Sequence, residues 1–574
     1  MPGTQAPGAV YRFGPFEVDA ETRSLRKRGL RIQVRGQSVE FLLALLERPG
    51  LVVTREELKR RLWPEGIFAE FEDSLNSVAN RLRDALGDRA ARPKYIETLP
   101  RVGYRFVGSL ARPASQAQEG RRYRLVVLPF LNLSGDSGHE YVCDGLTEEM
   151  IGQLACIGGP LSVIARTTAM HYKGTRKTAN QIARDLKVDY VLEGSLRLAG
   201  ERVRITAQLI AAAGEHHLWA KNYDGGLGDV LRLQEQVAQA VAAEIRCSVA
   251  PPAGRAVSAA AMELYIQGRV LGSAYPAPDF AAALKCLEQA VALEPEFAKA
   301  WAWLAESAAQ MAFWDYAPSG EAYPRARQAA QRALELDAAQ AEAHRALGWV
   351  HWYHDWDLPA ARREFERAAE LSPGDSSTLL ALALFHGSMR LDLAAAGPLA
   401  ERALELDPLA AHVWGHSGWL YYWTGHFDRA ISLARRSIQI DSRCLTAYCV
   451  LGLSLAGQNR HPEAIRAFEA GLQVNRGALL LAYLGMTLAV AGERGRAEAL
   501  MAELIERSAS EYVLPTCFAF IHLGLGETEA AMDRLEQAVR ERDAHTLWLR
   551  TSPRWAQLRG HPRFDALIAD VPTL

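Results

Sequence analysis

Cysteine is scarce in this chain, and its few copies lie far apart. Seven cysteines are spread over 574 residues, and none forms a Cys-x-x-Cys pair or another spacing of a zinc site. An odd, dispersed set argues against a disulfide framework and fits a reducing compartment. The composition therefore excludes the small disulfide-rich class of proteins and predicts no structural metal.

Long apolar segments are missing as well. The longest run without an acidic or basic side chain, residues 408–427, is broken by three histidines and several glycines, so it is a poor membrane span. The first ten residues lack the basic region and the apolar core of a secretory signal peptide. We therefore expect a soluble, cytoplasmic protein with no membrane segment.

The chain also lacks an excess of charge of one sign. It has 65 Lys and Arg against 67 Asp and Glu, a net charge of -2, which predicts no general affinity for polyanions. Residues 11–110 differ, because they contain 19 basic and 14 acidic side chains, a net charge of +5. This segment is the candidate for binding a polyanion.

No catalytic or nucleotide-binding motif is present. The first apolar strand of the middle segment is followed by LPFLNLSGDSGHE, which contains neither GxGxxG nor a GK[ST] ending. Asp144, Glu148 and Glu149 are expected near a helix start, where carboxylates interact favourably with the helix dipole, so a structural role is favoured over catalysis. His351 and His354 have no cysteine or carboxylate set beside them, which is weak evidence for a metal. We expect no enzyme, no cofactor and no metal ligand.

Two breaks divide the chain. Residues 111–120 (ARPASQAQEG) are small, polar and aperiodic, as in a flexible linker. The Pro-Pro pair in residues 250–253 cannot continue the helix expected before it. The predicted domains are residues 11–110, 121–249 and 258–570, the first two joined by the linker.

The first segment begins with alternating apolar and polar residues, which predict a small antiparallel sheet, and continues with three helices. Thr54 and Glu57 have the spacing of a capping box at the start of the second helix. The third helix has one apolar face and ends at Gly87. Its buried positions are Leu75, Ala79, Leu82 and Leu86, and its other face carries Asn76, Ser77, Asn80, Arg81 and Arg83.

That polar face has the chemistry of DNA recognition. Asn pairs bidentately with adenine and Arg with guanine, and both bind phosphate. Arg101 follows at the tip of a short hairpin, where it would reach a narrow minor groove. The alternative is the solvated face of an ordinary helix, but the order of sheet, three helices and basic hairpin favours a DNA-binding unit.

Residues 11–110 resemble the OmpR/PhoB-type winged-helix DNA-binding domain, through VTREELKRRLW, DSLNSVANRLRDALGD and YIETLPRVGYRF. The resemblance implies that residues 73–86 form the recognition helix. It implies base contacts from Asn76, Asn80 and Arg81, a phosphate contact from Arg83, and a wing contact from Arg101.

Two departures from relatives limit what carries over. Response regulators of this class have a phosphoacceptor domain ahead of the winged helix, and only about ten uncharged residues precede Tyr11 here. Membrane-bound, CadC-like one-component regulators have a membrane helix after it, which residues 111–120 cannot form. We therefore expect any input to arrive through the carboxyl-terminal part.

Residues 121–249 alternate strand and helix patterns and end with three consecutive strands and a closing helix, which predicts a mixed α/β domain. The edge strand is expected to carry His216 and His217. The segment resembles the small domain similar to the amino-terminal part of TolB, a resemblance that implies no established ligand.

From residue 258 onward the chain repeats itself. Similar helix ends such as LELDPLA and IQIDSRC recur, and the later spacings are 35, 35, 34 and 34 residues. This is the period of tetratricopeptide repeats. The pattern predicts about eight helix pairs up to Glu541 and a cap containing Trp548, Trp555 and Phe564.

Such a stack forms a superhelix whose concave surface binds peptides or proteins. One aromatic and histidine cluster is a candidate recognition patch, although aromatic residues at repeat positions are more often core. It consists of Trp349, His351, Trp352, Tyr353, His354 and Trp356.

The fold class expected is multi-domain α/β plus α: a winged helix-turn-helix, a small mixed α/β domain and an all-α repeat superhelix. The function expected is a one-component transcriptional regulator that binds double-stranded DNA, as a homodimer or in tandem, and receives a protein or peptide signal through its repeats. The alternative is a repeat scaffold or adaptor whose winged helix binds protein, or DNA non-specifically.

Overall fold

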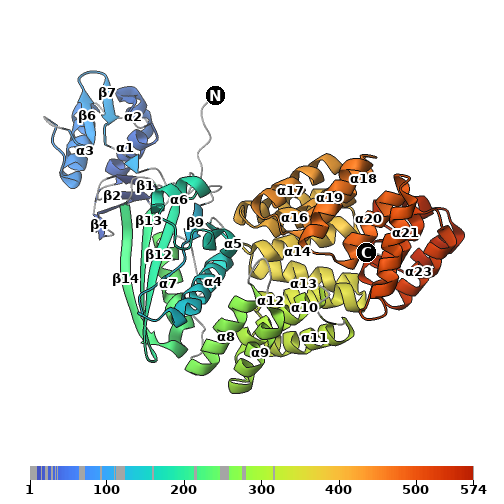
Figure 1. The fold of residues 1–574 in the computed structure, drawn as a ribbon. Helices are drawn as coiled ribbons and strands as arrows, with labels where there is room; N and C mark the ends of the chain where they lie inside the picture. The colour runs from blue at the N-terminus through green and yellow to red at the C-terminus, as the bar shows by residue number, and fades with distance from the viewer. Residues whose placement is uncertain are drawn as a thin grey trace. The chain divides into compact units, whose positions relative to one another are not determined.

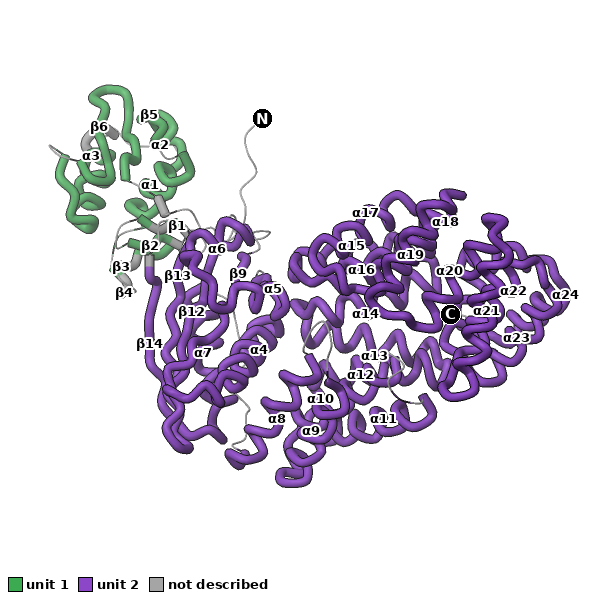
Figure 2. The backbone as a smooth tube through the Cα atoms, viewed as in Figure 1, with its two compact units in different colours: residues 1–121 green, residues 122–574 purple. Residues whose placement is uncertain are grey.

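The computed structural model forms two compact units, Met1–Arg121 and Arg122–Leu574 (Figures 1 and 2). Each unit has its own hydrophobic core. The structure describes residues 10–572 except 14–15, 20–22, 28–29, 33, 35, 49, 64–70, 91–92, 109, 112–122, 158–160, 213–215, 246–256, 274–278, 314–316 and 318.

The described residues of the first unit form two antiparallel sheets and three helices. The larger sheet has the strand order β4-β3-β2-β1-β8, and the smaller one has the order β5-β7-β6. The elements are β1 (Val10–Phe13), β2 (Phe16–Asp19), β3 (Ser24–Lys27), β4 (Leu30–Ile32), α1 (Gly36–Leu46), β5 (Val52–Thr54), α2 (Arg55–Leu62), α3 (Phe71–Leu86), β6 (Ile96–Leu99), β7 (Gly103–Phe106) and β8 (Leu110–Ala111).

Local signals in the sequence account for the helix boundaries of this unit. The Thr54 hydroxyl accepts the Glu57 backbone N–H at 3.2 Å, and the Glu57 carboxylate accepts the Thr54 N–H at 2.8 Å, so the predicted capping box is confirmed. The predicted stripe of α3 is also buried, with Leu75, Ala79, Leu82 and Leu86 at most 3% exposed. Gly87 ends α3 with a positive φ of 64°.

The second unit begins with the predicted mixed sheet, of order β11-β9-β12-β13-β14 with β10 paired to β12. The first three of these strands are parallel, and β12, β13 and β14 are antiparallel, with β14 at the edge as expected. The elements are β9 (Tyr123–Val127), β10 (Leu131–Asn132), α4 (Glu140–Ile157), β11 (Leu161–Val163), α5 (Arg166–Met170), α6 (Ala179–Leu186), β12 (Tyr190–Ala199), β13 (Arg202–Ala211), β14 (His216–Gly226) and α7 (Val230–Glu244).

The remaining helices pair successively from α8 to α23, and α24 follows as part of the cap (Figure 1). They are α8 (Ala259–Gly272), α9 (Phe280–Leu293), α10 (Ala298–Phe313), α11 (Ser319–Leu336), α12 (Ala341–Val350), α13 (Leu358–Leu371), α14 (Ser376–Met389), α15 (Leu393–Leu406), α16 (Ala411–Trp423), α17 (Phe427–Ile440), α18 (Leu445–Gly457), α19 (His461–Val474), α20 (Ala478–Val490), α21 (Arg494–Arg507), α22 (Pro515–Gly524), α23 (Thr528–Arg540) and α24 (Pro562–Ala569).

Glycines let the two helices of a pair approach closely. A Cβ atom at Gly348 would lie 2.6 Å from the ring of Phe365, and one at Gly452 would lie 2.4 Å from the ring of Phe468. Both distances are shorter than carbon atoms tolerate, so each phenylalanine occupies space that only glycine leaves open. In these two pairs a small residue on the first helix therefore makes room for a large ring on the second.

The aromatic cluster of the third pair is core, as its repeat positions suggested. Trp349, Trp352 and Tyr353 are at most 6% exposed, and the two indole rings stack with centroids 5.6 Å apart. His351 binds the Asp355 carboxylate through Nδ1 at 2.8 Å. No metal-binding group of His, Cys, Asp or Glu occurs among the described residues.

The carboxyl-terminal segment returns to the inner helices of the stack. Arg542 donates to the carbonyl of His354 at 2.7 Å, and the ring of Trp548 lies 5.5 Å from that of Trp423. The guanidinium of Arg554 lies 5.3 Å from the centroid of the Tyr483 ring. Residues 542–555 therefore pack against residues of the first helices of the helix pairs, or of the segment that follows one of them.

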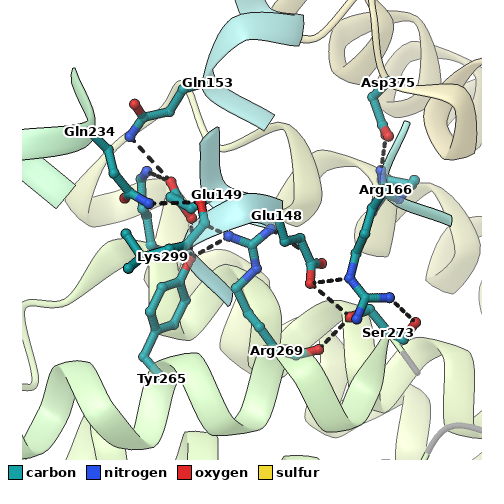
Figure 3. A network of polar contacts seen from close by, with 12 residues as sticks. Glu148, Glu149, Gln153, Arg166, Gln234, Tyr265, Arg269, Ser273, Lys299 and Asp375 are labelled. Carbon is teal, nitrogen blue, oxygen red and sulfur yellow. Dashed lines mark hydrogen bonds and ion pairs between the residues drawn. The ribbon is translucent and has the colours of Figure 1, made fainter. Parts of the chain in front are cut away.

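For Glu148 and Glu149 the prediction of a place near a helix start is wrong. Helix α4 begins at Glu140, so Asp144 lies near its start as expected, whereas Glu148 and Glu149 lie in its middle, where both are at most 7% exposed. Glu149 forms ion pairs with Arg269 of α8 and Lys299 of α10 (Figure 3). These carboxylates bind the mixed sheet domain to the first repeats instead of balancing a helix dipole.

A second contact joins the mixed sheet domain to the repeats between α15 and α16. The backbone N–H and the hydroxyl of Thr168 donate to the Asp407 carboxylate at 2.9 and 2.7 Å. The Thr168 hydroxyl in turn accepts the N–H of Leu409 at 2.8 Å. The predicted α/β domain and the first half of the repeat stack thus share one packed unit.

None of the described helices is both long enough and apolar enough to cross a lipid bilayer.

Candidate nucleic-acid interface

Helix α3 presents the predicted polar face, but its residues are not equally accessible. Ser77 and Asn80 are exposed, and Arg81 is half-buried with its Nε donating to the Ser77 carbonyl at 3.3 Å. Asn76 is turned partly inward, where its Oδ1 accepts the Tyr104 hydroxyl at 2.8 Å. The outward groups best placed to reach a partner are therefore Ser77, Asn80 and Arg81.

Arg83 does not lie on the exposed face, and the prediction that it does is wrong. Its side chain is 4% exposed and donates to the Ile96 carbonyl at 3.0 Å and to the Thr98 hydroxyl at 2.6 Å. Strand β6 packs over this edge of α3 and removes the guanidinium from solvent. Arg83 thus positions the hairpin against the helix and is not placed to hold a phosphate.

The hairpin tip exposes Arg101 in a strained backbone conformation. Strands β6 and β7 pair as far as Leu99 and Gly103, and the N–H of Val102 donates to the Leu99 carbonyl at 3.1 Å. Arg101 has a positive φ of 63°, a region that glycine or asparagine adopts more easily. With Pro100 before it, this is the arrangement of a type II turn. The turn directs a basic side chain away from the core at the end of the wing.

The wing is fastened to the second helix at its base. The N–H of Arg55 donates to the Val102 carbonyl at 3.1 Å, and β5 pairs with β7 from Val52 to Thr54. A Cβ atom at Gly103 would lie 2.1 Å from the carbonyl oxygen of Val53, so only glycine permits this close strand approach. The position of Arg101 relative to α2 is therefore fixed by backbone contacts.

Asp88 organises the segment between α3 and the wing, a role that was not predicted above. Its carboxylate accepts four backbone N–H groups, from Arg89, Lys94, Tyr95 and Ile96, at 2.7 to 3.1 Å. Burial alone would raise the pKa of Asp88, but the four donors hold it below its ordinary value. The Gly-Asp pair after a helix end was the available signal, because Asp often accepts nearby backbone donors in turns.

The chemical capacity of this surface follows from its exposed groups. Asn80 and Arg81 on α3 offer donors and acceptors suited to base edges, and Arg101 offers a cation on a rigid wing. The positive charge of the segment attracts a polyanion at long range. The arrangement has the parts of a major-groove helix and a flanking wing.

Three regions of the chain match known protein families. Residues 29–106 match the family described as transcriptional regulatory protein, C terminal. Residues 121–240 match the HilA/YgeH-like transcriptional regulator, second domain. Residues 274–310 and 313–376 match the tetratricopeptide repeat. The predicted resemblance to OmpR/PhoB-type domains and to tetratricopeptide repeats is confirmed, and the middle segment is similar to a domain of a transcriptional regulator.

Curated relatives match only part of the chain. The transcriptional regulator HilA of Salmonella typhi is 26% identical over 363 residues, which cover 60% of this chain and 61% of that protein. A Rhizobium meliloti protein with the provisional name adenylate cyclase 3 is 43% identical over 122 residues, 21% of each chain. This chain thus spans about a fifth of one relative and three fifths of the other.

Among solved structures, one similar chain is the DNA-binding domain of Klebsiella pneumoniae RstA in complex with the RstA box. It is 24% identical, covers 17% of this chain and 95% of its own, and superimposes with a TM-score of 0.16. The predicted fold class, a winged helix with a mixed sheet domain and helical repeats, is confirmed by the matches and by the two units themselves.

Proposed function

We propose that this chain is a one-component transcriptional regulator that binds specific double-stranded DNA through residues 11–110. The observation that carries the proposal is the combination, within one compact unit, of an exposed polar face on α3 and an exposed arginine on the wing. The match to a regulator domain and the similarity to HilA support it. On this proposal the protein acts in the cytoplasm, where chromosomal DNA is accessible, and is not an enzyme.

The site residues of the proposal follow from accessibility. Asn80 and Arg81 contact base edges, Ser77 contacts the backbone, and Arg101 enters the flanking minor groove or its phosphates. Asn76 and Arg83 do not contact DNA in this proposal, and their hydrogen bonds to the hairpin strands hold α3 and the wing in position. Arg83 was expected at a phosphate, and in the proposal it becomes a positioning residue.

The domains at 121–249 and 258–570 would form the receiving part of the regulator, with a protein or peptide as the signal. A single winged helix reads few base pairs, so the proposal includes a homodimer or tandem binding on repeated half-sites. Because residues 542–555 pack against first helices of the pairs, or beside them, we place the binding surface for a protein partner on the second helices of the pairs.

The test is selection of random duplexes by the full-length protein at two salt concentrations. We expect a motif with repeated half-sites. Arg81→Ala should relax preference at one position by about 1 to 3 kcal/mol, and Arg101→Ala should weaken all sequences and flatten the salt slope by about one unit. Arg540→Ala, an exposed arginine on α23, is the matched control and should change neither quantity.

Recovery of no motif, with binding that disappears as salt rises, would contradict the proposal. It would favour the alternative of a repeat scaffold whose winged helix binds DNA only through charge.

A further inference from the structure

The second unit encloses a cavity of about 520 Å³ between α4 and the first helices of the early repeat pairs. Its wall is built on the repeat side by α8, α10, α12 and α14 together with Asp407 and Arg443, and on the other side by Glu148 to Cys156 of α4 and by Arg166 of α5. The volume lies in the range of small-molecule sites, about 300 to 1,000 Å³. It is too small for a folded partner.

Most charges on this wall are paired with one another (Figure 3). Glu148 lies 2.9 Å from Arg166, and Glu149 pairs with Arg269 and Lys299. Deeper in the repeats, Arg345 lies between Glu306 at 3.1 Å and Asp375 at 2.5 Å. Pairing of this kind is what buried charges require, so these groups are accounted for by the fold itself.

Two carboxylate groups on the same wall are only partly used by these pairs, or not used at all. Glu306 is 6% exposed, and its Oε2 is buried with no hydrogen-bond partner in the part of the chain that the structure describes. The half-buried Glu342 interacts electrostatically with Arg269, Lys299 and Arg345, but forms no hydrogen bond or close ion pair with the described residues. Burial raises the pKa of Glu306, and Arg345 offsets this only in part.

The balance of charge around the cavity is negative. Six carboxylates line it, and four of the five lining cations are shared among them. The fifth cation, Arg443, pairs with Asp441, which is not part of the wall. A ligand that adds positive charge therefore offsets the remaining negative charge of the wall, whereas an anion would be repelled by it.

Aromatic side chains line the same cavity as Glu306 and Glu342. Trp303 and Trp349 line the cavity from α10 and α12, and the Nε1 of the buried Trp349 has no hydrogen-bond partner among the described residues. The guanidinium of Arg269 already lies 4.5 Å from the centroid of the Trp303 ring. Indole rings attract cations through their π faces and also bury apolar surface.

We infer that this cavity binds a small organic cation, an ammonium or guanidinium group on an apolar or aromatic body. The cationic group would pair with Glu306 and Glu342, and the body would pack on Trp303 and Trp349. The inference concerns the second unit alone and does not depend on DNA recognition. If the proposed function also holds, this ligand is an effector that reaches α4 and the repeats together.

The test is calorimetric titration of the full-length protein with three probes of one shape. These are 2-phenylethylammonium, the neutral 2-phenylethanol and the anionic 3-phenylpropionate. We expect the ammonium to bind at least about tenfold more tightly than the alcohol, and the anion not to bind, because one charge contact at a desolvated carboxylate is worth about 1.4 kcal/mol or more.

Variants locate the site. Glu342→Gln should weaken binding of the ammonium about tenfold and leave binding of the alcohol unchanged. Glu506→Gln, an exposed carboxylate on α21 outside the cavity, is the matched control and should have no effect. Glu306→Gln should act like Glu342→Gln, and thermal melting shows whether that buried substitution is tolerated; if it is not, Glu342→Gln alone decides.

Three results would overturn the inference. They are equal affinity for the ammonium and the alcohol, unchanged affinity of the folded Glu342→Gln protein, and absence of any ammonium binding up to about 10 mM, the weak limit of specific binding.

Discussion

Arg101 of the first unit and the most deeply buried arginines of the second unit are held in opposite ways. In the first unit, Arg101 is exposed at the wing tip, on a backbone that is strained to hold it there. In the second unit, Arg269 and Arg345 are 5% and 6% exposed, and each lies between two carboxylates. Exposed charge remains available to a partner, whereas buried charge must be neutralised internally.

The exceptions in each unit are informative. Arg83 is a buried cation among neutral oxygens in the first unit, and it fixes the wing. Glu342 is a half-buried acidic group without a close ion pair among the described residues, on a cavity wall where four of the five cations pair with other carboxylates. The burial of Arg83 is explained by the fold, whereas Glu342 indicates a place for a ligand.

The largest effect is expected where the pairing in the second unit is broken. Glu149→Ala removes the carboxylate partner of Lys299 and one of the two carboxylate partners of the buried Arg269, and should lower the free energy of unfolding by about 3 to 5 kcal/mol. Urea titration of the full chain measures it. The control is Glu288→Ala, whose ion pair with Arg325 is exposed and should contribute less than about 1 kcal/mol. Equal losses would remove the distinction between buried and exposed pairs.

Substitution of a buried aspartate in the second unit should raise the free energy of unfolding instead of lowering it. Burial raises the pKa of Asp407 to about 6, although Thr168 donates to it twice. Its ordinary pKa is 3.8, so the group's contribution to stability is present below pH 3.8 and is lost as pH rises through 6. Asp407→Asn should therefore raise the free energy of unfolding at pH 7 by up to about 3 kcal/mol.

The pH dependence is the check on this substitution. Denaturant midpoints of the Asp407→Asn and parent proteins should converge near pH 4. A gain that stays constant between pH 4 and pH 7 would show that ionisation of Asp407 is not its cause.

Asp88 in the first unit should give the opposite dependence of stability on pH. Four backbone donors hold its pKa below the ordinary value, so its stabilising contribution is present above pH 3.8 and is lost as pH falls through the lowered pKa. Asp88→Asn should cost about 1 to 3 kcal/mol at neutral pH, because charge-assisted hydrogen bonds are replaced by weaker ones. Hydrogen exchange of the Tyr95 and Ile96 amides should speed up accordingly, and unchanged protection would argue against the role given to Asp88.

The smallest effect on stability is expected at the wing tip. Arg101→Asn removes the charge but keeps a side chain that tolerates a positive φ, so stability should change by less than about 1 kcal/mol. The salt dependence of DNA binding should nevertheless fall by about one unit, as for Arg101→Ala. A large loss of stability in the asparagine variant would mean that Arg101 supports the fold and is not reserved for a partner.

Much of the first unit was predictable from the sequence because its signals are local. The stripe from Leu75 to Leu86 and the Thr54-Glu57 box involve residues a few positions apart. Arg83 was not predictable, since it follows Leu82 at the border of the buried stripe. Periodicity leaves such border positions undecided, and only the packing of β6 decides them.

In the second unit the repeats were predictable from their period, but the contacts between the repeats and the mixed sheet domain were not. Glu149 meets Arg269 and Lys299 at sequence separations of 120 and 150 residues, and no single-sequence pattern links them. Two adjacent acidic residues suggested the common explanation of a helix dipole. The long-range pairing that actually explains them requires the fold.

The two contacts of the mixed sheet domain also have a mechanical consequence. A stack of helix pairs is elastic, and its curvature is set by small rotations between neighbours. Here Glu149 forms ion pairs with α8 and α10, while Thr168 forms hydrogen bonds with the segment between α15 and α16. The mixed sheet domain therefore fixes the distance between two places in the stack. A partner that changes the curvature of the first four repeat pairs has to break one of these two sets of contacts.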